Sequence, residues 1–222
     1  MIVQVYGITT VADARMVAEL GADHVGIVPE HRGNWDGVEV DVANAIVDAL
    51  PEHVAAVVLS LGTTVHDVVA TARAAPGDWL HVVRTDVLGA DGLRAIRDAT
   101  GARLMATVAI DGPEAVGRAH ALSAQADALL LDSRDPASAV VGASGHTHDW
   151  SVSAAVVAAV VPAPVILAGG LGPDNVHDAI AQVAPWGVDS ETRTSTDADR
   201  RRKDPDRVQR FVENARRATT RS

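Results

Sequence analysis

Cysteine is absent from this 222-residue chain, and lysine, tyrosine and phenylalanine occur once each. Without a thiol, the chain cannot form disulfides, attack a substrate as a thiolate or bind a metal through sulfur. The single lysine, Lys203, stands just before the last helical stretch, so no strand carries a lysine for Schiff-base chemistry. These absences exclude several common kinds of enzyme site.

Long apolar runs and an excess of positive charge are also missing. No apolar segment reaches the length of a membrane span, and the first residues lack the basic-then-apolar pattern of a signal peptide. The formal charge of −10 argues against nucleic-acid binding. We therefore expect a cytoplasmic protein, monomer or homodimer, with no membrane or nucleic-acid partner. Its aspartate-rich, lysine-poor composition is typical of high-salt cytoplasms, and a GC-rich genome produces the same bias.

The chain does contain a regular alternation of apolar, strand-length runs and alanine-rich helical stretches. The expected strands are Ile2 to Tyr6, His24 to Val28, Val54 to Leu59, Trp79 to Arg84, Leu104 to Ile110, Ala128 to Asp132, Val165 to Ala168 and Gly187 to Ser190. The expected helices are Val11 to Leu20, Val40 to Leu50, Val65 to Ala74, Ala90 to Thr100, Glu114 to Ala124, Val152 to Val160, Pro173 to Gln182 and Pro205 to Arg217.

Eight such units predict an α/β protein whose residues 1–222 form one closed (β/α)8 TIM barrel with right-handed crossovers. An open, doubly wound sheet is the alternative. It is disfavoured because Tyr6-Gly7-Ile8-Thr9 follows the first strand, where that fold carries a G-x-G-x-x-G turn.

The segment from Pro164 to Asn175 predicts a phosphate-binding turn. A buried strand runs directly into Gly169 and Gly170, which have no side chains to separate their backbone N–H groups from a ligand. We place Pro173 in the first turn of the next helix, so that the positive end of the helix dipole faces the same space. A tight turn with nothing bound has the same pattern, so this segment alone leaves both interpretations open.

Barrel enzymes draw their catalytic side chains from the carboxyl ends of the strands and from the loops that follow. The polar residues at those positions are Tyr6, Glu30, His31, Arg32, His81, Arg84, Asp132, Ser190, Glu191, Thr192 and Arg193. Asp132 follows three leucines, so we expect partial desolvation to raise the pKa of its carboxyl toward that of a useful proton donor. An aspartate that caps or bridges loops is the simpler alternative.

Seven short motifs occur in order along the chain. They are Gly7-Ile8-Thr9-Thr10 with Ala12-Asp13-Ala14; Gly21-Ala22-Asp23; Leu130-Leu131-Asp132-Ser133; Gly142 to Gly145 with Thr147, Asp149 and Trp150; Ala168-Gly169-Gly170-Leu171 with Pro173-Asp174-Asn175; Gly187-Val188-Asp189; and Lys203-Asp204-Pro205. In this order and spacing the chain resembles the phosphoribosylanthranilate isomerase family. The resemblance spans the whole chain and implies a (β/α)8 barrel that binds a phosphorylated sugar after strands seven and eight, at Gly169, Gly170 and Thr192.

The resemblance also implies a reaction, the Amadori rearrangement of an aminoaldose to an aminoketose in tryptophan biosynthesis. In this family an aspartate at the end of strand six protonates the ring oxygen as the furanose opens, and Asp132 matches that position. A cysteine at the end of strand one removes the C2 proton, and Tyr6 stands in its place. Asp132 and Tyr6 are therefore the expected catalytic residues, acting on a small phosphorylated substrate with no cofactor and no metal.

Three departures from the family pattern fall in the expected site. A phenol titrates near 10 against roughly 8.5 for a thiol, so at neutral pH the basic form of Tyr6 is about thirtyfold scarcer than that of a cysteine. His81-Val82-Val83-Arg84 replaces a Gln-Leu-His-Gly pattern on strand four. After strand eight, Glu191-Thr192-Arg193 replaces a small Ser-Ser-Gly turn.

We interpret the altered turn after strand eight as a changed site rather than a lost one. Arg193 can bind a phosphate or a carboxylate through its planar fork, and Glu191 can hold Arg193 or act as a base. A surface salt bridge is the alternative. Arg32 matches an arginine that faces the anthranilate carboxylate in the family, so the expected substrate-binding set is Arg32, His81, Arg84, Glu191 and Arg193.

His146 and His148 have the alternate spacing of metal ligands in an extended segment. The family carries a glycine-rich loop there, which favours loop or substrate contacts over a metal. Three functions remain open from the sequence: an isomerase that uses Tyr6 in place of cysteine, a related barrel enzyme with lyase, aldol or hydrolytic chemistry on another phosphorylated or acidic metabolite, and a noncatalytic ligand-binding protein.

Overall fold

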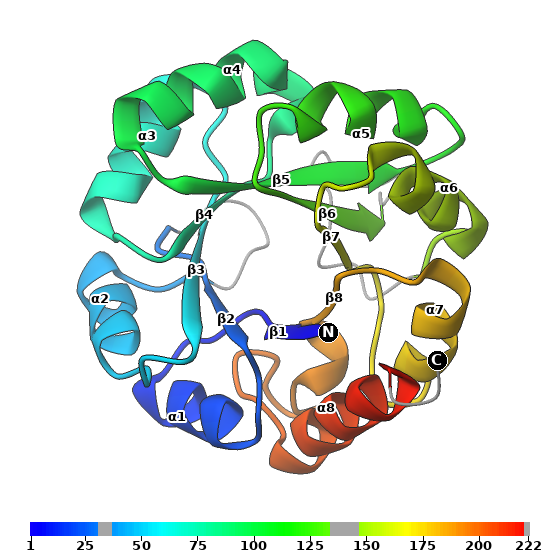
Figure 1. Ribbon diagram of the computed structural model, residues 1–222. Coiled ribbons are helices and arrows are strands. Elements are labelled where there is room, and N and C mark those ends of the chain that lie inside the picture. The colour runs from blue at the N-terminus through cyan, green and yellow to red at the C-terminus, as the bar shows by residue number, and fades with distance from the viewer. Residues whose placement is uncertain (31–36, 134–146, 220–222) are drawn as a thin grey trace.

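Eight parallel strands close on themselves, each pairing with the next along the chain, and β8 returns to β1 (Figure 1). The computed structural model describes residues 1–30, 37–133 and 147–219. The strands are β1 (Ile2–Val5), β2 (His24–Ile27), β3 (Ala55–Ser60), β4 (Trp79–Val82), β5 (Arg103–Ile110), β6 (Ala128–Ser133), β7 (Val165–Leu167) and β8 (Gly187–Ser190). The pairing of β1 with β8 excludes the open-sheet alternative, because an open sheet has two unpaired edges.

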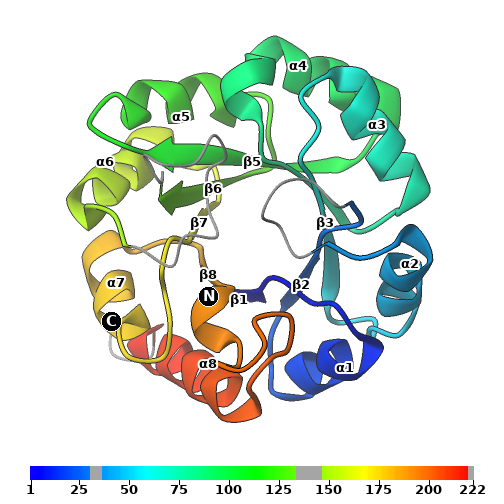
Figure 2. The ribbon, with the colours of Figure 1, turned by 180° about the vertical axis from the view of Figure 1, so that it is seen from behind.

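Helices form an outer ring around the strands (Figures 1 and 2). They are α1 (Val11–Glu19), α2 (Val40–Asp48), α3 (Val65–Ala74), α4 (Thr85–Thr100), α5 (Ala115–Ser123), α6 (Trp150–Val160), α7 (Val176–Val183) and α8 (Pro205–Thr219), with a short 3-10 turn, η1 (Thr192–Thr194), between β8 and α8. The predicted (β/α)8 barrel is confirmed. Among the described residues, no helix is both long and apolar enough to span a bilayer.

Two helices, α4 and α7, begin three or more residues from their predicted starts. α4 starts at Thr85 and not at Ala90, because the chain is helical on both sides of a kink at Gly89, whose φ is 60°. α7 starts at Val176 and not at Pro173. The Asn175 side chain accepts a hydrogen bond from the Gly172 backbone N–H at 2.8 Å and holds the preceding residues in a turn, so the helix begins three residues later.

Side chains alternate along each strand between the barrel interior and the helical layer. One buried apolar cluster, which includes Leu59, Trp79, Met105, Leu130 and Ile166, fills the interior. A second cluster joins the outward side chains of the strands to the inward faces of the helices, with Phe211 of α8 fully buried in it. The strand ends are therefore held by packing on both sides.

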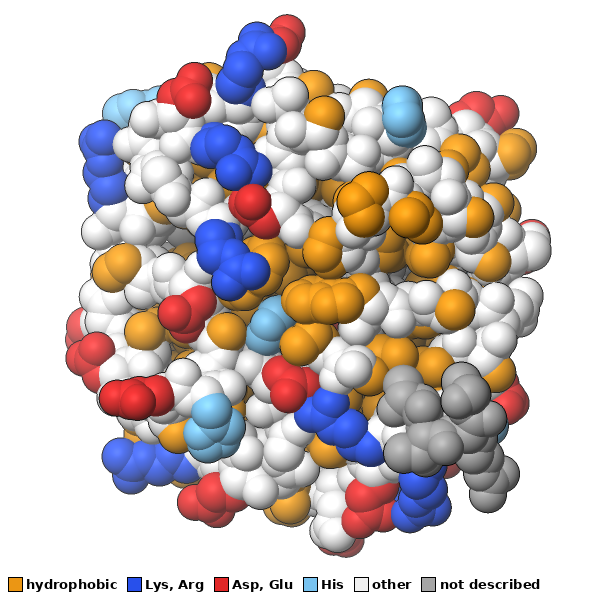
Figure 3. All heavy atoms as spheres, viewed as in Figure 1, with side chains coloured by type: hydrophobic (Ala, Val, Ile, Leu, Met, Phe, Trp, Pro, Cys, Tyr) orange, Lys and Arg blue, Asp and Glu red, His pale blue; other side chains and the backbone are white. Residues whose placement is uncertain are grey.

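Aromatic packing closes the end of the barrel where the strands begin. Trp79 opens β4, and the guanidinium of Arg103, which opens β5, lies 3.9 Å from its ring centroid. The rings of His24 and Trp186 lie 5.8 and 6.5 Å from the Trp79 ring. On the face seen in Figure 1, hydrophobic side chains gather near the middle of the surface (Figure 3). The opposite end, where the strands finish, is the place for a site.

Candidate active site

A small polar cavity lies at the carboxyl ends of β6, β7 and β8, at the mouth of the barrel. Its lining consists of Asp132, Gly169, Gly170, Leu171, Asp189, Ser190, Glu191, Thr192 and Arg193. All of these except Leu171 and Asp189 were named as candidate site residues from the sequence. Three strand ends supply them, which a closed parallel barrel places side by side. We call this group of residues the mouth site.

Asp132 is the carboxyl of the mouth site that suits proton donation. It lies near the end of β6 and accepts a hydrogen bond from the Ser133 backbone N–H at 2.7 Å. Burial raises the pKa of its carboxyl to about 7, the Ser133 hydrogen bond opposes this rise, and the charge of Glu191 adds to it. A carboxyl with this pKa is about half protonated at neutral pH, so it can act as a general acid.

Asp189 is a second carboxyl of the mouth site, and no sequence pattern indicated a role for it. It lies on β8 opposite Gln4 of β1 and is only 7% exposed. Burial raises the pKa of its carboxyl, and the charge of Asp132 raises it further. Its Oδ1 has no hydrogen-bond partner among the described residues. The two carboxyls therefore share one poorly solvated site, in which burial disfavours the ionised form of each.

Tyr6 belongs to a buried polar chain that runs across the barrel interior. Its hydroxyl lies 2.7 Å from Nδ1 of His81, and Nε2 of His81 lies 2.7 Å from Oγ1 of Thr107. Burial lowers the pKa of His81 to about 3, so the imidazole is neutral and weakly basic. Burial also raises the pKa of the Tyr6 phenol well above 10, and the charges of Asp189 and Glu191 add to this rise. The phenol therefore keeps its proton at neutral pH.

Glu191 follows β8 directly, and its backbone is held firmly. The carbonyl oxygen of Glu191 accepts hydrogen bonds from Lys203 Nζ at 2.9 Å, from Thr194 Oγ1 at 2.9 Å and from Ser195 Oγ at 3.0 Å. The Glu191 side chain extends over Gly7, just beyond β1. A Cβ added at Gly7 would lie 3.0 Å from its Cγ, 3.3 Å from its Oε1 and 3.4 Å from Lys203 Nζ. Glu191 and the only lysine therefore meet at the end of β1.

The glycine turn after β7 has the backbone that the phosphate prediction requires. Gly169 and Gly170 have φ of 81° and 62°, which side chains with a Cβ rarely adopt. A Cβ added at Gly169 would lie 2.4 Å from Ser133 Oγ. The Asn175 amide donates to the Gly170 carbonyl at 3.1 Å, and Ser190 Oγ donates to the Leu171 carbonyl at 2.7 Å. The turn is thus fixed against β6 and β8.

The remaining predicted residues are distributed more widely. Arg84 pairs with Asp86 through two hydrogen bonds of 2.9 and 3.1 Å, at the start of α4. The stem of Arg193 packs on Gly172, where an added Cβ would lie 2.6 Å from the Arg193 Cβ. Arg32 lies outside the described residues, so its predicted contact with the substrate stays a prediction.

The histidines that suggested a metal are only partly described, because His146 lies outside the described residues. Nδ1 of His148 lies 3.1 Å from Ser133 Oγ, and its Nε2 lies 2.7 Å from Ser153 Oγ. Burial lowers the pKa of His148 to about 4. Within residues 1–30, 37–133 and 147–219, no group of three or more potential metal-binding side chains is found.

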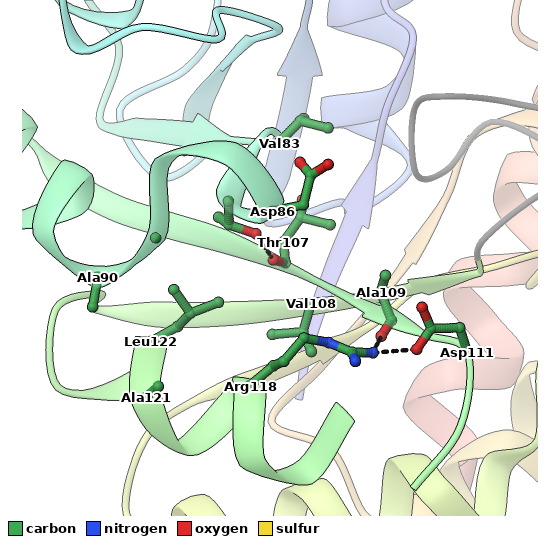
Figure 4. Close-up of a pocket in the computed structure, with 12 residues that line it drawn as sticks. Val83, Asp86, Ala90, Thr107, Val108, Ala109, Asp111, Arg118, Ala121 and Leu122 are labelled. Atoms are coloured by element: carbon green, nitrogen blue, oxygen red, sulfur yellow. Dashed lines mark hydrogen bonds and ion pairs between the residues drawn. The ribbon is translucent and has the colours of Figure 1, made fainter. Parts of the chain in front are cut away.

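A larger cavity of about 310 Å³ lies outside the barrel, against β5 and between α4 and α5 (Figure 4). Arg118 reaches across it to the Ala109 carbonyl, at 2.8 Å, and to Asp111. This cavity contains none of the buried carboxyls at the barrel mouth. We therefore place the chemistry at the smaller mouth site, where acidic groups with raised pKa converge.

Residues 3–214 match the family model for N-(5'-phosphoribosyl)anthranilate isomerase. The chain belongs to this family. It is 38% identical over 220 residues to the N-(5'-phosphoribosyl)anthranilate isomerase of Haloferax volcanii, covering 95% of this chain and 90% of the relative. The phosphoribosylanthranilate isomerase structure from Thermotoga maritima is 27% identical, with a TM-score of 0.81 over 97% of this chain and 99% of that one.

A further phosphoribosylanthranilate isomerase structure contains a phosphorylated ligand. It is in complex with reduced 1-(o-carboxyphenylamino)-1-deoxyribulose 5-phosphate, and it matches with a TM-score of 0.78 and 25% identity over 97% of this chain and 99% of that one. The family resemblance expected from the sequence is thus confirmed, and with it an isomerase family of tryptophan biosynthesis.

Proposed function

We propose that this chain isomerises N-(5'-phosphoribosyl)anthranilate, an aminoaldose phosphate, to the corresponding aminoketose, with Asp132 as the general acid. One observation carries the proposal. Asp132 is a partly buried carboxyl at the barrel mouth with a pKa of about 7, so a large share of the molecules can donate a proton to the sugar ring at neutral pH.

The substrate phosphate is assigned to the glycine turn. Gly169 and Gly170 present backbone groups, while Thr192 and Arg193 add a hydroxyl and a guanidinium from the neighbouring loop. His81 supports the floor of the site through Tyr6, and Arg32, which matches the family's arginine in the sequence, is assigned to the carboxylate of the anthranilate ring. No cofactor enters the proposal, because proton transfers alone complete the rearrangement.

The test is complementation of a tryptophan auxotroph that lacks this isomerase, together with an assay on the purified protein. Conversion is followed by the loss of phosphoribosylanthranilate fluorescence, at low and at high salt. We expect growth without tryptophan and a fluorescence loss that Asp132→Asn abolishes. No growth and no fluorescence loss at either salt concentration would contradict the proposal. That result would favour a different phosphorylated or acidic substrate, the alternative that the departures from the family pattern at Tyr6 and Arg193 left open.

A further inference from the structure

The isomerisation needs a base as well as an acid, and the end of β1 does not supply one. The family's base acts from the residue that is Tyr6 here, but the Tyr6 phenol is buried, protonated and hydrogen-bonded to a weakly basic imidazole. A group that holds its proton this firmly cannot remove one from carbon at neutral pH. If the reaction proceeds, another side chain must face the same substrate atom.

We propose that Glu191 is the base that removes the C2 proton, so that this role has moved from the end of β1 to the loop after β8. The assignment rests on the proposed function. Its geometric support is the position of the Glu191 side chain, whose Oε1 lies 3.3 Å from the point where a Cβ at Gly7 would stand, one residue after Tyr6. Glu191 also lines the mouth site together with Asp132.

The surroundings of Glu191 suit a carboxylate base. Lys203 Nζ faces the same point at the end of β1. Burial lowers the pKa of Lys203 to about 8, and the charge of Glu191 opposes this fall. Asp132 is partly buried and Asp189 is buried, and the pKa values of both carboxyls are raised. A carboxylate base beside a protonated carboxyl is the acid and base pair that the chemistry requires.

The backbone of Glu191 is also preorganised for this role. Lys203, Thr194 and Ser195 all bind its carbonyl oxygen, so its main chain is fixed while the side chain reaches over Gly7. Catalytic groups need such support, because small displacements from a reactive geometry cost much of the rate. Substitution of the Glu191 side chain leaves all three of these contacts in place.

The proton-transfer step balances as follows. Once Asp132 has protonated the ring oxygen and the ring has opened, C1 and the nitrogen form an iminium ion. Glu191 takes the proton from C2, the electrons of the broken C2–H bond form the C1=C2 bond, and the electrons of the C1=N bond return to nitrogen. The resulting enol loses its O–H proton as C1 gains one, which gives the aminoketone. The substrate gains and loses equal numbers of protons, and no oxidant or reductant is needed.

The test compares Glu191→Gln with the wild type in the fluorescence assay, with Glu213→Gln as the matched control on the outer surface of α8. We expect kcat to fall by about 10²-fold or more in Glu191→Gln with little change in KM, and the control to match the wild type. A wild-type kcat in Glu191→Gln overturns the assignment. A wild-type protein with no isomerase activity overturns the proposed function itself, and the assignment with it.

A second variant separates catalysis from a structural contribution. In Glu191→Ala, added formate can occupy the vacated space beside Lys203 and act as an external base. We expect added formate to raise the kcat of Glu191→Ala about tenfold. Formate should leave the kcat of Asp132→Asn unchanged, because a small acid replaces only a group whose place it can fill. If formate fails to restore the activity of a variant whose thermal unfolding matches the wild type, the carboxylate is not the base.

Discussion

The hydroxyl of Tyr6 lies 2.7 Å from Nδ1 of His81, and this contact fixes the buried Tyr6 ring at the end of β1. The ring also packs on β2, because a Cβ added at Gly26 would lie 2.2 Å from Tyr6 Cδ1. Tyr6 is therefore part of the barrel packing as well as of the mouth. Its role is testable by substitutions that separate the ring from the hydroxyl.

We predict that Tyr6→Cys does not raise activity on phosphoribosylanthranilate above that of the wild type. The thiol would face Glu191, and loss of the ring would leave a cavity against Gly26 that destabilises the fold by about 3 kcal/mol. Urea unfolding and the fluorescence assay measure the two effects. A gain in activity from Tyr6→Cys alone would show that the end of β1 still supplies the base.

Tyr6→Phe keeps the ring and removes only the hydroxyl. It leaves a buried His81 nitrogen without its partner, so we expect a loss of about 1–3 kcal/mol in the free energy of unfolding. Equal stability of Tyr6→Phe and the wild type in urea unfolding would show that this hydrogen bond contributes little.

Asp132→Asn should abolish turnover and change the pH dependence of stability. The pKa of Asp132 is raised from 3.8 to about 7, so between those values the folded protein holds a proton that the unfolded chain has released. This contribution to stability is complete below about pH 4 and is lost as the pH rises through 7. The asparagine side chain of the variant cannot ionise, so the variant should gain stability relative to the wild type above pH 7.

Thermal unfolding at pH 4 and pH 8 measures this difference, with exposed Asp178→Asn as the control. In the wild type, kcat should fall above about pH 7 as Asp132 loses its proton. A variant that keeps more than about a tenth of the wild-type activity would be inconsistent with general acid catalysis by Asp132.

The glycine turn can be tested by binding inorganic phosphate. We predict that Gly170→Val abolishes phosphate binding in calorimetry, because a side chain would cover the backbone N–H groups. Gly101→Val is the matched control, since Gly101 has a φ of 65° and Gly170 has a φ of 62°. A Cβ added at Gly101 meets nothing within 4 Å. Both variants carry a similar backbone strain. If both bind phosphate as the wild type does, the phosphate assignment fails.

The burial of Lys203 predicts a simple labelling pattern. The chain offers two amines, the α-amino group and Lys203, and Lys203 is only 4% exposed. We expect an amine-reactive reagent to modify only the α-amino group of the native protein, and both amines in urea. Peptide mapping by mass spectrometry distinguishes the sites. Rapid native labelling of Lys203 would contradict its contacts with Glu191 and Ser195.

Much of the fold could be predicted from local patterns. β8 and α3 have the predicted bounds, because glycine, proline and polar residues mark their ends. The start of α7 was predicted three residues too early. Pro173 indicated a first helical turn, but the Asn175 side chain accepts a hydrogen bond from the Gly172 N–H and holds these residues in a non-helical turn. The kink at Gly89 concealed the first part of α4 for a similar local reason.

The site was harder to predict than the fold, because its contacts join distant strands. Asp132 and the glycine turn carry local signals, and the mouth site contains both. The pairing of Tyr6 with His81 spans 75 residues and has no local signal. The predicted site did not include Asp189. Asp189 and Glu191 are two residues apart at a strand end, and this spacing indicates that both side chains lie on the same inward face.

The pairing of β1 with β8 has a consequence for the order of assembly during translation. Of the eight strands, β1 leaves the ribosome first. Its neighbour β8 begins only at Gly187, so β1 has one unpaired edge until then. Arg216 of α8, which binds Asp23, is made later still. Until then the nascent chain exposes the backbone edge of β1, where another strand can add. A ribosome that pauses between β7 and β8 would therefore prolong the interval in which this chain is most exposed to aggregation.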